Sequence, residues 1–146
     1  AARNLNQQLT SYKMKKEYLA VVKGIPQNSE ETLVHELIKD AKTNTSKVAV
    51  KKEAQSKRAE LSYCLKKTIG EESLLQIALK TGRHHQIRCQ LSNLGCPIKG
   101  DLKYGAPRSN PDGGISLHAR RIIFTHPVRK EQMTVEAPVP SSWKGI

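Results

Sequence analysis

The sequence predicts an α+β fold with a mostly antiparallel sheet. Several stretches of alternating apolar and polar residues predict half-buried strands, and short turn-forming segments join them as in hairpins. The clearest pair spans residues 61–65 and 75–79, with Gly70 and its acidic neighbours in the turn between them. Apolar residues at helical spacing occur at the start of the chain and again around residues 83–94. Strands linked by hairpins, with few helices, indicate the α+β class.

The first fifty residues predict one helix and one strand. The opening helix is indicated by apolar residues at helical spacing, namely Ala2, Leu5, Leu9 and Tyr12. Because a domain rarely begins inside such a pattern, we expect that an upstream segment has been removed. Residues 18–24 alternate as a strand. Residues 33–38 have helix-like spacing between turn signals, so their state stays open, and the polar residues 40–52 indicate a hairpin or loop.

The second half predicts a helix, a loop and two further strands. The helix over residues 83–94 has an apolar stripe of Ile87, Leu91 and Leu94, and Gly95 is a suitable stop. Residues 100–114 are rich in Gly and Pro and predict a loop. Residues 121–125 and 132–136 predict two strands, joined by a turn around Pro127.

Composition limits the function classes. The chain has 146 residues, enough for one domain, and 25 Lys and Arg against 13 Asp and Glu give a net charge of +12. Such an excess predicts a polyanionic partner, and RNA or DNA is favoured over a membrane because no basic amphipathic anchor helix stands out. The longest apolar run is residues 19–22, which excludes a transmembrane helix. The odd count of three Cys and the scattered His indicate reduced thiols in a cytoplasmic protein, without a metal site.

An acid-free stretch predicts where a polyanion would bind. Residues 73–100 contain neither Asp nor Glu, but they contain six basic or titratable residues, Lys80, Arg83, His84, His85, Arg88 and Lys99. One interpretation is a groove for the phosphate backbone. The alternative is a solvated surface whose charges pair with acids from other segments.

Three positions in this region and before it stay ambiguous. Arg88 lies at the edge of the apolar stripe with no carboxylate on its own helix, so its partner lies in another segment, the site is incomplete, or the side chain extends to water. His84 and His85 favour structural or phosphate contacts over acid–base work, because no nucleophile and base are apparent. Tyr18 is either a core aromatic or a platform on which a base stacks.

An ordered set of short motifs spans nearly the whole chain. The set includes Thr-Gly-Arg-His-His-Gln-Ile-Arg at 81–88, Leu-Gly-Cys-Pro-Ile-Lys-Gly-Asp at 94–101, Lys-Tyr-Gly at 103–105, Leu-His-Ala at 117–119 and Phe-Thr-His-Pro at 124–127. The motifs Lys-Glu-Tyr-Leu-Ala at 16–20, Ala-Glu-Leu-Ser-Tyr at 59–63 and Ala-Pro-Val-Pro at 137–140 complete it. Together these motifs resemble the RluA-type pseudouridine synthases, the uridine isomerases of ribosomal and transfer RNA. The resemblance implies a mixed, mainly antiparallel sheet with flanking helices and an RNA cleft. It also implies that the N1–C1′ bond of a uridine in rRNA or tRNA is replaced by a C5–C1′ bond, without cofactor or metal.

The resemblance also implies roles for individual residues. Tyr18 matches the tyrosine that packs against the target base, Arg88 the basic residue that pairs with the catalytic Asp, and Ile87 a neighbouring pocket residue. The family's Asp lies in a His-Arg-Leu-Asp-type motif that this chain lacks, and Asp101 matches a Gly-Asp step interpreted as structural. We therefore expect Arg88 to pair with a carboxylate upstream of Ala1.

The functional expectations follow from this partial match. Residues 1–146 are expected to be a single, incomplete catalytic domain that is inactive alone. RNA contacts are expected from Arg83, His84, His85, Lys99 and Lys103. The alternative is an RNA-binding module that has kept the cleft and lost the chemistry; a DNA-binding domain is disfavoured because no recognition-helix motif is present.

Overall fold

The computed structural model describes residues 15–125, 132–140 and 143. The expected opening helix and the turn around Pro127 lie outside these residues. Seven strands form one sheet in the order β3-β2-β4-β5-β1-β6-β7, and each adjacent pair is antiparallel. In chain order the elements are β1 Lys15–Lys23, β2 Glu30–Asp40, β3 Thr45–Val48, β4 Lys57–Ile69, β5 Glu72–Leu79, α2 Gln86–Asn93, the 3-10 helix η1 Leu102–Tyr104, β6 Leu117–Thr125 and β7 Gln132–Glu136. The α+β class and the mainly antiparallel sheet are therefore confirmed.

Residues 33–38, whose state the sequence left open, lie in the long strand β2. Leu33 and Leu37 lie four positions apart, which suits one face of either a helix or a strand. Both are buried, whereas Val34 on the opposite face is exposed. Pairing with β4 over eight positions decides for the strand. The polar segment that follows is a hairpin, in which β3 pairs with the end of β2.

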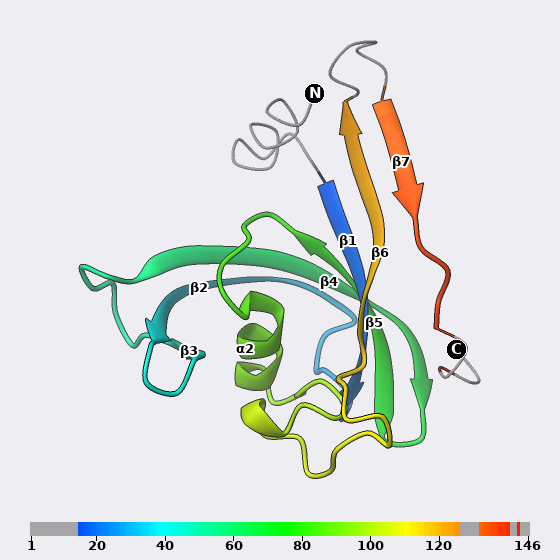
Figure 1. Cartoon of the computed structure of the whole chain (residues 1–146), viewed down its shortest axis with the longest axis horizontal. Helices are drawn as coiled ribbons and strands as arrows, with labels where there is room; N and C mark the ends of the chain where they lie inside the picture. The colour runs from blue at the N-terminus through cyan, green and yellow to red at the C-terminus, as the bar shows by residue number, and fades with distance from the viewer. Residues whose placement is uncertain (1–14, 126–131, 141–142, 144–146) are drawn as a thin grey trace.

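The core lies between one face of the sheet and α2. Alternate residues of β4 and β5 point to this face, and their register pairs Leu61 with Leu79, Tyr63 with Ile77 and Leu65 with Leu75. Helix residues Ile87 and Leu91 pack against them in one buried cluster. Figure 1 shows β2 and β4 as a long curved pair that bends over α2 towards β3. A second, smaller cluster of Leu37, Ala59 and Cys89 continues the packing along this arm.

The helix is shorter than predicted at its start. It begins at Gln86, because His85 adopts a left-handed backbone with φ 52° and ends the preceding loop. At the other end Gly95 has φ 94°, as the predicted stop requires. Within the described ranges, no helix is both long and apolar enough to cross a membrane.

Candidate functional site

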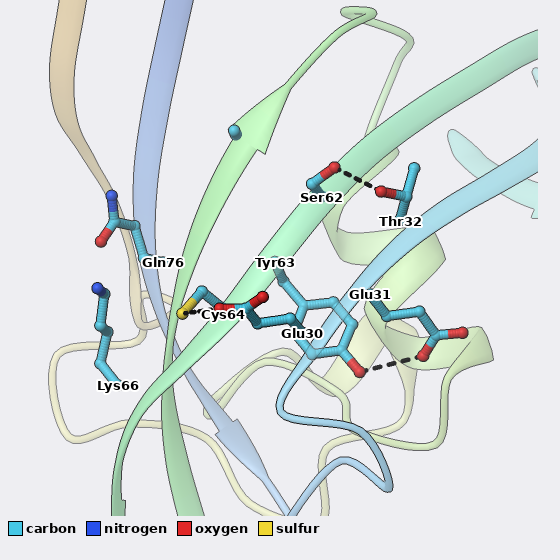
Figure 2. A pocket seen from close by; sticks show the side chains of 9 residues that line it. Glu30, Glu31, Thr32, Ser62, Tyr63, Cys64, Lys66 and Gln76 are labelled. Carbon is cyan, nitrogen blue, oxygen red and sulfur yellow. Dashed lines mark hydrogen bonds between the residues drawn. The ribbon is translucent and has the colours of Figure 1, made fainter.

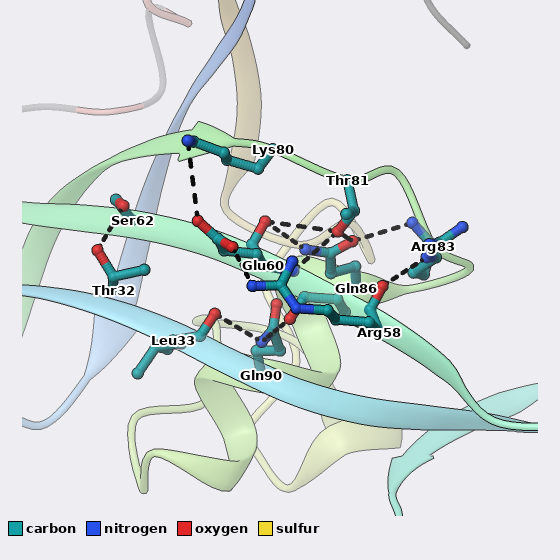
Figure 3. A network of polar contacts seen from close by, with 11 residues as sticks. Thr32, Leu33, Arg58, Glu60, Ser62, Lys80, Thr81, Arg83, Gln86 and Gln90 are labelled. Atoms are coloured by element: carbon teal, nitrogen blue, oxygen red, sulfur yellow. Dashed lines mark hydrogen bonds and ion pairs between the residues drawn. The ribbon is translucent and has the colours of Figure 1, made fainter. Parts of the chain in front are cut away.

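Two glutamines fix α2 to the backbone of the sheet. The Gln86 amide donates to the carbonyl of Glu60 at 3.0 Å, and its oxygen accepts from the hydroxyl of Thr81 at 2.7 Å and from the backbone N–H of Arg83 at 2.9 Å. The Gln90 amide donates to the carbonyl of Leu33 at 3.3 Å. Figure 3 shows both side chains reaching from the helix to the strands. Their bonds position the loop before α2 and the helix that carries Ile87 and Arg88.

Arg88 has its carboxylate partner within this chain. Its Nε donates to Oδ2 of Asp101 at 2.9 Å and its Nη2 to Oδ1 at 2.8 Å, which is a bidentate pair. The Asp101 side chain is only 1% exposed and that of Arg88 20%. The expectation that Arg88 lacks a partner, because an upstream Asp would supply it, is therefore wrong. Because Asp101 is buried, the negative charge of its carboxylate would be uncompensated if Arg88 did not pair with it.

Arg88 also joins a chain of polar contacts with two rings. Its Nη1 lies 3.1 Å from Nε2 of His85, and Nδ1 of His85 lies 2.8 Å from the hydroxyl of Tyr104. The Tyr104 hydroxyl accepts the backbone N–H of Ser46 at 2.8 Å, and the Ser46 hydroxyl donates to the carbonyl of His84 at 2.6 Å. We call Ser46, His84, His85, Arg88, Asp101 and Tyr104 the Arg88 network. It links β3, the loop before α2, the helix and η1.

Local burial and positive charge keep His85 neutral. Burial, followed by the charges of Arg88, His84 and Lys103, lowers the pKa of His85 to about 4 against the opposing effect of Asp101. The rings of His84 and His85 stack with centroids 3.8 Å apart. A neutral His85 is able to accept a hydrogen bond from Arg88 through Nε2 while Nδ1–H donates to Tyr104. The two histidines therefore have contacts within the protein, and their roles in RNA binding stay predictions.

Tyr18 lies on the same sheet face as α2. It pairs with Ile77 on β5, and it packs half-buried against the main core cluster that contains Ile87. The pairing of β1 with β6 shifts register between Glu17 and Tyr18, which marks a β-bulge. Bulges bend a strand and redirect its side chains, and they are frequent beside active sites. Ile87 is 6% exposed and belongs to that cluster.

The acid-free stretch does not form one continuous cationic surface. Lys99 pairs with Glu72 at 3.5 Å beside a cavity of about 390 Å³ near β1 and β5, and Lys80 lies 4.0 Å from Glu60. Lys80, Arg88 and Lys99 thus each lie within 4.0 Å of a carboxylate from another segment, as the alternative interpretation expects. Arg83 is held differently, because its Nε donates to the backbone carbonyl of Arg58 at 2.8 Å. The roles of Arg83, Lys99 and Lys103 in RNA binding stay predictions.

Another cavity lies on the opposite sheet face. It has about 510 Å³ and includes Thr32, Ser62 and Gln76, which alternate along their strands with core residues. Figure 2 shows Glu30 beside the thiol of Cys64 and Glu31 bonded to the hydroxyl of Tyr63. Burial and these contacts with Glu31 raise the pKa of Tyr63 to about 12. With two carboxylates against one lysine, Lys66, the cavity has the wrong charge for a phosphate backbone, and it contains none of the predicted site residues.

Comparison with known protein families shows to which family this chain belongs. The profile of the family described as RNA pseudouridylate synthase matches residues 1–93, more than half of the chain. The chain belongs to the RNA pseudouridylate synthase family. The match agrees with the RluA-type resemblance of the motifs. A ribosomal large subunit pseudouridine synthase C of Buchnera aphidicola is 32% identical over 99% of this chain, and a tRNA pseudouridine synthase C of Haemophilus ducreyi is 31% identical over 98%.

The fold of this chain also matches that of a solved structure. The human RNA pseudouridylate synthase domain containing 4 superposes with a TM-score of 0.80 over 97% of this chain, at 22% sequence identity. The chain covers 64% of that structure, 48% of the Buchnera protein and 65% of the Haemophilus protein. It thus spans about half to two thirds of these pseudouridine synthases.

Sequence reasoning missed two members of the Arg88 network, Ser46 and Tyr104. It also missed that Asp101 pairs with Arg88. Asp101 and Tyr104 are three residues apart, as are His85 and Arg88. That shared spacing was the available signal, because residues three apart on a helical turn lie on one side. Ser46 had no such signal, since it is 58 residues from Tyr104 and meets it only through the fold.

Proposed function

We propose that this chain is part of the catalytic domain of an RNA pseudouridine synthase that converts uridine to pseudouridine in rRNA or tRNA. Family membership is the observation that carries the proposal. The named functions of the Buchnera and Haemophilus relatives support both classes of RNA. The net charge of +12 suits such a substrate, and we place the protein in the cytoplasm.

The reaction is a rearrangement within one nucleotide. The N1–C1′ bond of the uridine breaks, the base turns, a C5–C1′ bond forms, and the C5 proton leaves while N1 gains one. Substrate atoms account for every bond, so the step needs no redox partner. The base must leave its stack to be reached, and Tyr18 would offset part of that cost by packing on the base.

Arg88 would act as a positioning residue. Of its five N–H donors, two are used by Asp101 and one faces His85. Two donors therefore remain for a second acceptor, such as the catalytic carboxylate expected from the family pattern. A guanidinium fixed by a buried Asp would hold that carboxylate ionised and oriented.

The aspartates of this chain favour a carboxylate from outside residues 1–146. The Asp40 carboxylate accepts the backbone N–H of Lys42, Asp112 that of Gly114, and Asp101 is held by Arg88. The chain has no other Asp. The same observation supports the second candidate, an RNA-binding module without chemistry.

Release of tritium from RNA labelled at C5 of uridine tests the proposal, because each isomerisation frees one C5 hydrogen. We expect release by the full-length protein and none by residues 1–146 alone. Release by the isolated residues would contradict the external carboxylate. RNA binding by the full-length protein without release, on both rRNA and tRNA, would favour the binding module.

A further inference from the structure

A small cavity at the tip of the curved arm is lined by cationic side chains. It has about 190 Å³ and lies between the β2–β3–β4 arm and the loop before α2. That volume admits a phosphate group with a few waters, since liquid water occupies about 30 Å³ per molecule. We call it the arm pocket; it is lined by Leu37, Lys39, Ser46, Gln55, Lys57, Gly82, Arg83 and His84.

Strand register brings the two lysines to this pocket. Leu37 is buried against α2, so its side chain defines the helix-facing side of β2. Lys39, two positions later, points to the same side, and Lys57 does so because it pairs directly with Leu37 across the sheet. Ser46 pairs with Lys39 and shares that side. Three neighbouring strands thus contribute polar groups to one small space.

The loop before α2 closes the pocket from the other side and is held firmly. Gln86 accepts the backbone N–H of Arg83 at 2.9 Å, and Ser46 donates to the carbonyl of His84 at 2.6 Å. The Nε of Arg83 is fixed on the carbonyl of Arg58 at 2.8 Å, which leaves its terminal nitrogens for a ligand. Contacts of this loop with β3 and β4 therefore hold this wall of the arm pocket in place.

The pocket has no compensating acid. None of its lining residues is Asp or Glu, and the ion pairs of the described chain include neither Lys39, Lys57 nor Arg83. Asp40 follows Lys39, but its carboxylate accepts the backbone N–H of Lys42 at 3.0 Å. Loss of hydration lowers the pKa of His84, and the charges of Lys39, Arg88 and Lys103 lower it further. Three cationic side chains, Lys39, Lys57 and Arg83, therefore surround one cavity and attract an anion.

We propose that the arm pocket binds a backbone phosphate of RNA, with Lys39, Lys57 and Arg83 as its contacts. The proposal rests on the proposed function for the identity of the polyanion. A guanidinium and two ammonium groups match the oxygens of a phosphodiester. Ser46 and His84 belong to both the arm pocket and the Arg88 network, so RNA held here would pass beside α2 towards Arg88.

Charge-neutral variants with a matched control test the pocket. Lys39→Gln and Lys57→Gln remove one cation each, and Lys66→Gln makes the same change on β4 beside the cavity of the opposite face. Binding of the full-length protein to a fluorescein-labelled RNA stem-loop is measured between 50 and about 300 mM NaCl. We expect each pocket variant to weaken binding about three- to tenfold, and the double variant to lower the slope of log K against log salt by roughly one. We expect Lys66→Gln to leave the slope unchanged.

The outcomes separate the pocket from the enzyme. If the double variant has the affinity and salt slope of Lys66→Gln, the pocket proposal is overturned even where tritium release shows an active enzyme. If the slope falls but no tritium is released, the pocket stands and the enzyme proposal fails. Competition by inorganic phosphate is the last measurement. If phosphate displaces RNA no better than NaCl of equal ionic strength, the assignment of the arm pocket to an RNA phosphodiester is supported. If phosphate alone reduces wild-type binding to the level of the double variant, the free ion competes with the RNA for the arm pocket, and the contact with an RNA phosphate is supported as well.

Discussion

Arg88 and Asp101 form a bidentate pair that ties the first half of α2 to the loop after it, with N–O distances of 2.9 and 2.8 Å. The carboxylate is nearly inaccessible to solvent, at 1% exposure. The pair thus joins two of the motifs that resemble the RluA-type pattern, residues 81–88 and 94–101.

The first prediction concerns stability. Asp101→Asn leaves the Arg88 guanidinium without its counter-charge in a mostly buried place, so we expect the free energy of unfolding to fall by about 3 kcal/mol. Urea unfolding measures the loss. Glu72→Gln is the control, because Glu72 pairs with Lys23 and Lys99 nearer the surface and should cost under about 1 kcal/mol. Equal losses would show that the Arg88–Asp101 pair contributes no more than a surface pair.

The second prediction separates positioning from affinity at Arg88. Arg88→Lys keeps the positive charge but loses the planar fork that serves Asp101 and a second acceptor at once. We expect kcat for tritium release to fall by about 100-fold, with the Kd for the RNA stem-loop changed less than about threefold. Comparable losses in kcat and affinity would instead assign Arg88 to contact with the RNA backbone.

The third prediction concerns stacking by Tyr18. Removing the ring with Tyr18→Leu should cost about 1–3 kcal/mol of base stacking, measured as a loss in kcat/KM. Tyr18→Phe retains the aromatic face and is the matched control, for which we expect a much smaller loss. If Phe is as damaging as Leu, the hydroxyl rather than the ring carries the function of Tyr18.

The fourth prediction follows from the neutral state of His85. Its pKa is about 4 in the folded protein and 6.5 in an unfolded chain. Between these values the unfolded chain binds more protons, so the free energy of unfolding falls as pH drops from 6.5 towards 4. His84 and His35 also have lowered pKa values and contribute in the same direction.

His85→Asn isolates the contribution of this one ring. Asn tolerates the left-handed backbone at this position and does not titrate. We expect the variant to be less stable than the wild type at pH 7, with a shallower decline of Tm between pH 6.5 and 4. Parallel Tm profiles for the two proteins would show that His85 is protonated equally in the folded and unfolded states.

Much of the sheet could be predicted because its signals are local. The alternation in residues 61–65 and 75–79 and the turn at Gly70 define the β4–β5 hairpin without knowledge of the rest. β2 could not be assigned, because Leu33 and Leu37 are compatible with both helix and strand. Only pairing with β4, twenty or more residues away, distinguishes them.

The site was harder to predict because its contacts depend on the folded loops. The position of Arg88 at the edge of the apolar stripe indicated a carboxylate from another segment, which the structure bears out. The family pattern then pointed upstream of Ala1, whereas the structure places Asp101, thirteen residues downstream, against the guanidinium. Likewise, Lys99 belongs to the same acid-free stretch as Arg83, but it lies beside Glu72 and away from the arm pocket.

The attachment of α2 has an evolutionary consequence. Gln86 and Gln90 bind carbonyl groups of Glu60, Leu33 and Ala59, which every amino acid at those positions would present. Outward side chains of β2 and β4 are thus free to diverge without shifting the helix. Substitutions on the outward face of the arm would then leave the geometry around Arg88 intact.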